Sequence, residues 1–314
     1  MKRVLYLSHA TPEVYAIIRA AAPTEFELRT LERDSDDERR AKIADCEVVI
    51  VAATPFRKAM LDAARRLELV PHQGVGWQDT TDHAAIKARG IPLALTPEGT
   101  TVGAAEHTVL LILAALKRLP FADSELRQGR FHINALRPVS RELCGLTVGY
   151  VGLGRIGRAV FDRLRPFGTH SLYFDPAVSA VEGIEARPLE VLLAESDIVS
   201  LHVPLTADTR HMIGVAELAR MKRGAYLVNT ARGGLVDEAA LAAALKEGRL
   251  AGAALDVFET EPVAAGHPLA VLPNVVLTPH IAAGTRDALA TKMRALFANV
   301  RRFYRGEPLE NRVL

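Results

Sequence analysis

Side chains that suit acid–base chemistry follow three apolar, strand-like runs in the last third of the sequence. Arg232 follows AYLVNTA, and His280 follows VVLTP. Between them, Glu259 and Glu261 follow LAGAALDV. Because the carboxyl ends of parallel strands meet at one edge of a sheet, we expect these groups to lie close together. Their spacing alone does not decide which of the two glutamates takes part in chemistry.

These side chains suit the reduction of a 2-oxo acid by hydride. An arginine can bind the substrate carboxylate through two parallel hydrogen bonds and polarise the carbonyl group. A histidine can deliver a proton to the carbonyl oxygen as hydride reaches the carbon. A carboxylate behind the imidazole would orient the ring and favour its charged form. Each residue taken alone is more often structural, so it is their collective placement that indicates a catalytic site.

A dinucleotide-binding pattern precedes these residues. The segment LTVGYVGLGRIGRAVFDRL carries Gly152, Gly154 and Gly157 in G-x-G-x-x-G spacing, between a predicted strand and a predicted helix. The glycines allow backbone N–H groups to approach a pyrophosphate, and the helix N-terminus adds a favourable dipole. A second strand ends at Asp175. This carboxylate would accept hydrogen bonds from ribose hydroxyls and repel a 2′-phosphate, which favours NAD over NADP.

The elements that must position these groups alternate between strands and helices along the chain. One series runs from RVLYLS to IPLALT, and a second runs from LTVGYVG to VVLTPH. Apolar strands that are each followed by a helix indicate a parallel sheet covered on both faces. The segment TTVGAAEHTVLLILAALKRL is predicted to be a long helix crossing between two domains. The last helix has its apolar positions on one face, and the C-terminal EPLENRVL is expected to rejoin the first domain.

Composition argues against several classes of partner. The 314 residues include 39 basic and 37 acidic side chains with no basic stripe, so we expect no nucleic acid and no anionic membrane as partner. The most apolar run, TVLLILAAL, is too short to span a bilayer, and the N-terminus lacks the apolar core of a signal peptide. Cys46 and Cys144 are far apart and form no metal-binding spacing. We therefore expect a cytoplasmic protein without a metal site.

Taken together, these motifs resemble the D-isomer-specific 2-hydroxyacid dehydrogenases. The resemblance extends over nearly the whole chain, through GVG, AEHT, GLGRIGRAV, PLTADTRHMI, NTARGGLVDEAAL, AALDVFETEP and HPLAVLPNVVLTPHIA. It implies an NAD-dependent oxidoreductase whose catalytic residues are Arg232, Glu261 and His280. It therefore selects Glu261 over Glu259, and Pro262 restricts the backbone at the selected position. By contrast, His107 in AEHT is expected to have a structural role.

The resemblance also implies a split α/β fold with two doubly wound parallel-sheet domains. A Rossmann NAD-binding domain of residues 99–286 would be inserted in a flavodoxin-like substrate domain of residues 1–98 and 287–314, with the active site in the cleft. Members of the family are usually homodimers. Substrate would be bound by Val75 and Gly76, together with Arg232 and His280. The implied contacts to NAD are Gly152, Gly154, Arg155, Ile156, Gly157, Asp175, Val203, Pro204, Thr209, Thr230, Ala231, Asp256 and Ala282.

Departures from the family pattern concern the substrate. Trp77 and Gln78 follow the GVG loop, where the family usually has an aliphatic residue and then Asp. Phosphoglycerate-specific relatives carry an arginine just before this loop, where the chain has His72 and Gln73. This loss favours a small, unphosphorylated 2-oxo acid, and glyoxylate, hydroxypyruvate, pyruvate and bulkier acids remain open. The alternative function is an NADH-sensing, co-repressor-like binding protein on the same fold.

Overall fold

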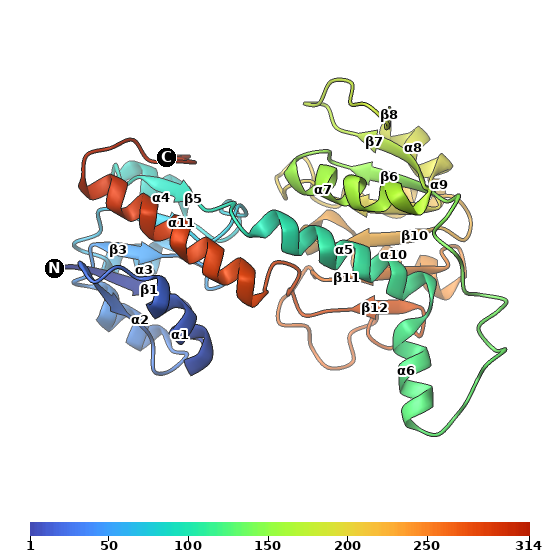
Figure 1. Ribbon diagram of the computed structural model, residues 1–314, viewed down its shortest axis with the longest axis horizontal. Coiled ribbons are helices and arrows are strands. Elements are labelled where there is room, and N and C mark those ends of the chain that lie inside the picture. Colours follow the sequence, from blue (N-terminus) through green and yellow to red (C-terminus); the bar gives the residue numbers. More distant parts are fainter. The chain divides into compact units, whose positions relative to one another are not determined.

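The computed structural model describes residues 1–314, which form two compact units. Unit 1 comprises Met1–Thr100 and Gly284–Leu314, and unit 2 comprises Thr101–Ala283. Each unit has parallel strands with helices on both faces (Figure 1), so the predicted α/β fold class is confirmed. No helix is both long enough and apolar enough to cross a lipid bilayer.

Unit 1 is built on short parallel strands. They are β1 (Lys2–Tyr6), β2 (Phe26–Arg29), β3 (Val48–Ile50), β4 (Val70–His72) and β5 (Leu93–Leu95). Hydrogen bonds order three of them as β2-β1-β3 and the other two as β4-β5. Isolated parallel bridges, such as the one from Val51 to His72, join β3 to β4. The resulting order, 2-1-3-4-5, is that of a flavodoxin-like sheet.

Helices cover both faces of this sheet, because successive strand residues point to opposite sides. The helices are α1 (Pro12–Ala21), α2 (Asp36–Ile43), α3 (Lys58–Ala63), α4 (His83–Ala88) and α11 (Arg286–Tyr304). Val4 and Tyr6 of β1 belong to the apolar cluster with α1 and α11, whereas Leu5 belongs to the cluster with the other three helices. Met293 and Val300 of α11 are fully buried, as the spacing of its apolar positions predicts.

The C-terminal segment belongs to unit 1. After α11, the Leu95 amide donates to the Asn311 carbonyl at 3.0 Å, and the Val313 amide donates to the Leu93 carbonyl at 2.9 Å. The end of the chain therefore pairs with β5 at the edge of the sheet. The C-terminal segment thus lies in the same unit as the N-terminal strands.

Unit 2 contains a larger parallel sheet. Its strands are β6 (Thr147–Val151), β7 (His170–Phe174), β8 (Glu185–Ala186), β9 (Ile198–Leu201), β10 (Tyr226–Asn229), β11 (Gly252–Leu255) and β12 (Val275–Leu277). Their order is β12-β11-β10-β9-β6-β7-β8, which is the Rossmann order extended by one strand. The order reverses between β6 and β9. Open α/β sheets bind ligands beyond the carboxyl ends of the strands at such a switch point.

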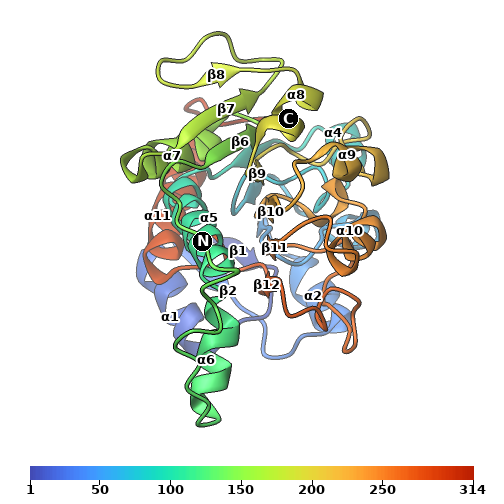
Figure 2. The same cartoon turned by 90° about the vertical axis from the view of Figure 1, so that its right-hand side faces the viewer.

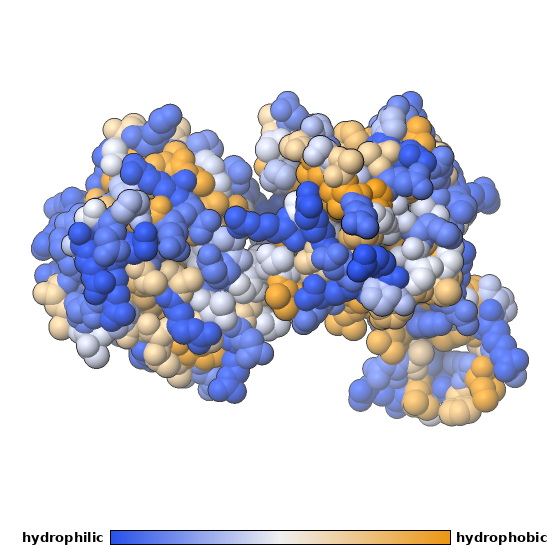
Figure 3. All heavy atoms as spheres, turned by 45° about the horizontal axis from the view of Figure 1, so that its top comes forward, coloured by the Kyte–Doolittle hydropathy of each residue, from blue (hydrophilic) through white to orange (hydrophobic).

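An arm projects from the body of unit 2. It comprises helix α6 (Leu119–Arg127) and the following residues 128–141, and it extends away from the sheet in both views (Figures 1 and 2). No residue of α6 is buried. Hydrophobic side chains nevertheless gather on the arm (Figure 3). Those with large exposed fractions are Leu119, Phe121, Leu126, Phe131, Ile133 and Val139.

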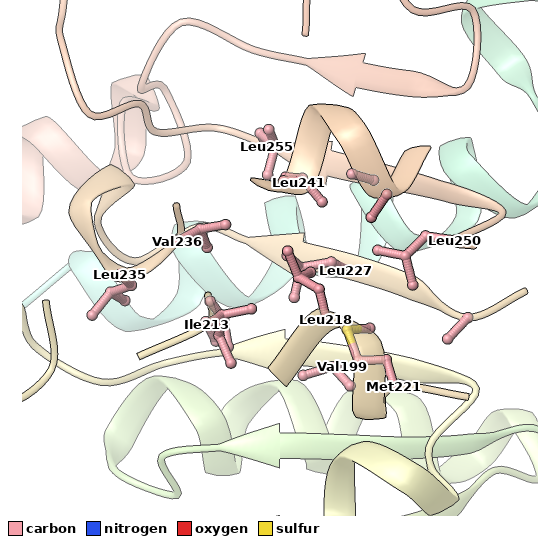
Figure 4. Close-up of a cluster of buried hydrophobic side chains, with 14 of the residues drawn as sticks. Val199, Ile213, Leu218, Met221, Leu227, Leu235, Val236, Leu241, Leu250 and Leu255 are labelled. Carbon is pink, nitrogen blue, oxygen red and sulfur yellow. The ribbon is translucent and has the colours of Figure 1, made fainter. Parts of the chain in front are cut away.

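The remaining helices of unit 2 enclose an apolar cluster on each face of the sheet. They are α5 (Thr100–Leu116), α7 (Arg155–Leu164), α8 (Leu189–Glu195), α9 (Val215–Arg220) and α10 (Glu238–Lys246). Leu227 of β10 points into the cluster with α9 and α10 (Figure 4), whereas Tyr226 and Val228 point into the cluster with α5 and α7. Burial of one such leucine contributes roughly 1.5–3 kcal/mol. Strand ends on this sheet are thus held from both sides.

Candidate active site

The turn after β6 leaves room for the backbone of a dinucleotide. Gly152 has a φ of 95°, and a Cβ there would lie 2.8 Å from the backbone of His202. A Cβ at Gly157 would lie 2.3 Å from the Gly152 carbonyl oxygen. Both positions therefore exclude a side chain. A Cβ at Gly154 would have no protein atom within 4 Å, so the space beside this residue is open to a ligand.

The start of α7 offers hydrogen-bond donors for an anion. Gly154 caps the helix without a side-chain hydrogen bond, which leaves the first-turn amides of Arg155 and Ile156 available. Asp175 follows β7, and its carboxylate accepts the Leu153 amide at 2.8 Å. The carboxylate keeps further lone pairs for hydroxyl donors. These residues fit the pyrophosphate and the ribose of a dinucleotide.

The strand across the switch point, β9, is followed by His202, which no sequence motif marks as a site residue. His202 Nε2 lies 2.9 Å from Ser200 Oγ, and the ring stacks on Tyr150 with 6.3 Å between the centroids. Desolvation lowers the pKa of His202 to about 4, so its ring is neutral at pH 7. In the sequence, His202 lies near the end of the apolar run IVSLHVP, and this position could have indicated a place at the ligand-binding edge.

Thr209 holds the segment after His202 in a hydrogen-bonded loop. The Thr209 hydroxyl donates to the Pro204 carbonyl at 2.7 Å and accepts the Thr206 amide at 2.8 Å. The Val203 side chain borders the glycine turn, because a Cβ at Gly152 would lie 2.8 Å from it. Three of the expected cofactor contacts therefore lie in one closed loop at the switch point.

Arg232 lies in a turn after β10 that Asn229 braces. Asn229 Nδ2 donates to the Arg232 carbonyl at 2.8 Å, and Asn229 Oδ1 accepts the Ala231 amide at 3.0 Å. The next residue, Gly233, has no room for a side chain, because a Cβ there would lie 1.8 Å from the Phe258 carbonyl carbon. The turn that carries the arginine is thus in direct contact with the loop that follows β11.

Asp256 at the end of β11 fixes the turn that carries His280. His280 has a φ of 54°, a conformation that is costly for a residue with a side chain. The Asp256 carbonyl accepts the His280 amide at 2.8 Å. The Asp256 carboxylate, which is fully buried, accepts the Ile281 amide at 2.9 Å and the Ala282 amide at 2.8 Å. These three hydrogen bonds hold the strained turn in place.

Glu261 and His280 form a hydrogen-bonded pair. His280 Nδ1 lies 2.7 Å from Glu261 Oε2, and Glu261 Oε1 accepts the Phe258 amide at 2.9 Å. Desolvation alone would raise the pKa of Glu261, but these two hydrogen bonds and the charges of His280 and Arg232 hold it below its ordinary value. An ionised carboxylate only accepts, so Nδ1 carries a hydrogen. Nε2 is therefore the atom left to exchange a proton with a ligand.

Glu259 has different partners from Glu261. Its Oε1 accepts the Glu238 amide at 3.1 Å, while Glu238 Oε1 accepts the Glu259 amide at 2.8 Å. His211 Nε2 lies 3.3 Å from the same Glu259 oxygen. Glu259 thus attaches the loop after β11 to the start of α10. This contact was not visible in the sequence, because Glu238 is distant along the chain.

Residues of α5 brace the ends of β10 and β12. His107 Nε2 lies 2.9 Å from Thr278 Oγ1, and that hydroxyl donates to Asp256 Oδ1 at 2.6 Å. Thr108 Oγ1 lies 2.8 Å from Thr230 Oγ1. His107 therefore contacts the buried carboxylate network behind the His280 turn and occupies a supporting position. Thr278 is a part of this network that no sequence motif indicates.

The remaining expected substrate contacts, Val75 and Gly76, lie in unit 1, in the loop after β4. No protein group accepts a hydrogen bond from either amide. Val75 is also 40% exposed. Successive free backbone N–H groups of this kind can receive an anion.

A sequence model of one family matches the part of the chain that carries this site. The match covers residues 109–282, and the family is described as D-isomer specific 2-hydroxyacid dehydrogenase, NAD binding domain. The matched segment contains the glycine turn, Arg232, Glu261 and His280. The fold and the site thus define an oxidoreductase that uses a nicotinamide cofactor.

Relatives extend the match beyond the cofactor-binding segment. A glyoxylate reductase of Korarchaeum cryptofilum is 41% identical over 85% of this chain and 82% of its own length. A glyoxylate reductase of Thermofilum pendens is 44% identical over 81% of this chain and 77% of its own length. A D-3-phosphoglycerate dehydrogenase of Archaeoglobus fulgidus is 38% identical over 85% of this chain, but the match spans only 51% of that protein.

Solved structures agree with this relationship. The TT0316 protein of Thermus thermophilus has a TM-score of 0.89 at 33% identity, with both chains fully covered. An NADPH-dependent glyoxylate/hydroxypyruvate reductase from Sinorhizobium meliloti has a TM-score of 0.87 at 32% identity, covering 100% of this chain and 98% of that one. The chain therefore belongs to the D-isomer-specific 2-hydroxyacid dehydrogenase family, and it is an enzyme. The alternative of a co-repressor-like binding protein is not favoured by these relatives.

Proposed function

We propose that the enzyme reduces small, unphosphorylated 2-oxo acids of the glyoxylate and hydroxypyruvate class to D-2-hydroxy acids, with NADH. The observation that carries this proposal is the Glu261–His280 pair at the strand edge that also bears the glycine turn and Arg232. A fixed imidazole with a free Nε2, at the same sheet edge as an arginine and a dinucleotide-binding turn, suits reduction of a carbonyl group that stands beside a carboxylate.

In the proposed reaction the three catalytic residues have separate roles. Arg232 binds the substrate carboxylate and polarises the carbonyl. When bound, the cofactor supplies the hydride that reaches the carbonyl carbon. His280 transfers its Nε2 proton to the carbonyl oxygen, so the product is the neutral alcohol group of a 2-hydroxy acid. Glu261 keeps the Nδ1 hydrogen bond throughout, and the side chain of His280, 48% exposed, regains its proton from water.

The cofactor contacts are proposed as a set in unit 2. Arg155 and Ile156 offer amides to the pyrophosphate, and Asp175 receives the ribose hydroxyls. The same carboxylate would repel a 2′-phosphate, which supports NADH over NADPH. The remaining proposed contacts are Gly152, Gly154, Gly157, Val203, Pro204, Thr209, Thr230, Ala231, Asp256 and Ala282.

In unit 1, we propose that the amides of Val75 and Gly76 receive the substrate carboxylate. Their lack of a protein acceptor supports this role. His72 and Gln73 precede the loop. The absence of an arginine there supports an unphosphorylated substrate, although D-3-phosphoglycerate dehydrogenases are also among the relatives.

A panel assay tests the proposed function. Oxidation of NADH and NADPH would be followed with glyoxylate, hydroxypyruvate, pyruvate, a branched 2-oxo acid and 3-phosphohydroxypyruvate. We expect the highest kcat/KM for glyoxylate or hydroxypyruvate with NADH. A higher kcat/KM with the phosphorylated acid would overturn the substrate assignment, and a preference for NADPH would overturn the role of Asp175. Binding of NADH without oxidation by any 2-oxo acid would point instead to a sensing protein.

We also propose that the enzyme is a cytoplasmic homodimer. The exposed apolar side chains of the arm support self-association, because contiguous apolar surface on a folded protein marks an interaction site. A cavity of about 190 Å³ on the arm is bordered by Phe121, Leu126 and Phe131, and a second copy of the arm has matching apolar side chains.

The cysteines support the proposed cytoplasmic location. Cys46 and Cys144 are both free thiols, which suits a reducing compartment.

A further inference from the structure

A chain of hydrogen bonds runs from the end of β4 into the loop that carries Val75 and Gly76. His72 is the last residue of β4 and is 4% exposed. Its Nε2 lies 2.8 Å from Thr80 Oγ1. The same hydroxyl oxygen lies 2.9 Å from the carbonyl oxygen of Gly76. A buried imidazole is thus connected to the loop through one threonine.

The donors and acceptors in this series of hydrogen bonds follow from the chemistry of the three groups. A carbonyl oxygen can only accept, so the single hydrogen of the Thr80 hydroxyl is donated to Gly76. The hydroxyl oxygen must then accept from its other partner. His72 Nε2 therefore carries a hydrogen and donates it to Thr80. The Gly76 carbonyl receives no other hydrogen bond from the protein, so its orientation depends on Thr80.

The carbonyl groups of the loop are held, and its amides are free. The Gly74 carbonyl accepts the Thr96 amide at 3.2 Å, and the Gly76 carbonyl accepts the Thr80 hydroxyl. In a trans peptide the carbonyl and the next amide point in opposite directions. Fixing the Gly74 carbonyl thus directs the Val75 amide away from Thr96. The Gly76 amide lies between two peptide groups whose orientations are both fixed.

We propose that His72 and Thr80 are positioning residues for the substrate carboxylate. His72 orients the Thr80 hydroxyl, Thr80 holds the Gly76 carbonyl, and the amides of Val75 and Gly76 are thereby kept in place before substrate arrives. The inference rests on the proposed function of these amides as the carboxylate site. A loop that is ordered in advance loses less entropy on binding, so we expect loss of this ordering to weaken substrate affinity and not to lower kcat.

Thr80→Val is the main test, because valine keeps the shape of threonine and removes only the hydroxyl. We expect the KM for the preferred 2-oxo acid to rise about fivefold to tenfold, with kcat within about twofold of wild type. The Kd of oxalate, measured by calorimetry on the NADH-saturated enzyme, should rise by the same factor. The Kd of NADH should not change. Thr80→Ser restores the hydroxyl and should restore both KM and the Kd of oxalate.

Thr81→Val is the matched control. The Thr81 hydroxyl donates to the Trp77 carbonyl at 2.7 Å, but that carbonyl also accepts the Thr81 amide at 3.0 Å. In Thr81→Val the Trp77 carbonyl therefore still accepts the Thr81 amide, so its orientation is kept. We expect its KM and oxalate Kd to stay within about twofold of wild type. An equal effect of both substitutions would overturn the proposal in favour of general loosening of the loop.

His72 variants test the first step of the chain. His72→Leu should reproduce the KM of Thr80→Val, and the double variant should be no worse than either single variant, because both break one chain. His72→Gln presents an amide N–H at a similar reach and should recover part of the loss. If the wild type is active and Thr80→Val has an unchanged KM and oxalate Kd, the positioning role of His72 and Thr80 is refuted, but the proposed function is not. A wild type that neither turns over any 2-oxo acid nor binds oxalate would refute the proposed function.

Discussion

Glu259 and Glu261 show how two acids of one short loop acquire different roles. Glu261 is hydrogen-bonded to His280 and to a backbone amide, which together with nearby charges lowers its pKa. Glu259 is hydrogen-bonded to the amide of Glu238. The sequence indicated that this loop would carry an acid to the strand edge. Spacing could not select between the two, because the selection depends on how the loop folds against α10.

A pair of matched substitutions tests this division. Glu261→Gln keeps the size of the side chain but removes the charge that holds His280, so we expect kcat to fall by on the order of 10²-fold. Glu259→Gln retains an oxygen that can accept the Glu238 amide, so kcat should stay within about twofold of wild type. Steady-state oxidation of NADH at saturating 2-oxo acid measures both. Equal losses of kcat in the two variants would contradict the assignment.

The site residues that the sequence could suggest are those at strand ends in recognisable motifs. Arg232, Glu261 and His280 fall in this class. The supporting contacts could not be predicted in the same way. Asp256 accepts two amides of the His280 turn, and that geometry follows from the positive φ of His280, which a sequence pattern does not reveal.

At the scale of elements, the doubly wound sheets were predictable because each apolar strand is followed by a helix. The boundaries of the individual strands and helices were less predictable. β8 has only two residues, Glu185 and Ala186, both exposed, and no apolar run marks it. The arm was also missed, because α6 has no buried face and the sequence pattern of buried helices does not apply to it.

The end of β9 leads to a prediction about stability and pH. The pKa of His202 is about 4 in the folded protein, below the ordinary value of 6.5, because its ring is desolvated. Between these values the unfolded chain binds a proton that the folded protein does not. Stability is therefore expected to fall as the pH is lowered through this window, by about 2 kcal/mol from this group between pH 7 and pH 5.

Urea unfolding at pH 7 and pH 5 measures this effect. The variant His202→Gln should lose that part of the pH dependence, because it removes the group that titrates. His170→Gln is the control, since His170 is exposed at the start of β7, and this variant should keep the wild-type dependence. Equal pH dependence in wild type and His202→Gln would contradict the role assigned to His202.

At the scale of the whole molecule, the arm leads to a prediction about assembly. The side chains of Phe131 and Ile133 are 75% and 70% exposed, so charges there should not disturb the fold of unit 2. We expect wild type to sediment at twice the 34.1 kDa of one chain and Phe131→Glu/Ile133→Glu to sediment as a monomer. Val215→Glu, at a position that is 71% exposed on α9, should remain a dimer. A double variant that stays dimeric would place the interface elsewhere.

The central claim is that this family member transfers a proton from His280 during reduction of a 2-oxo acid. The most direct test is the kcat for NADH oxidation of His280→Ala with the best 2-oxo acid, alongside the Kd of NADH from its fluorescence. We predict a loss of kcat on the order of 10²-fold to 10⁴-fold with an unchanged Kd. Wild-type kcat in His280→Ala would contradict the claim, because the proton would then come from another group.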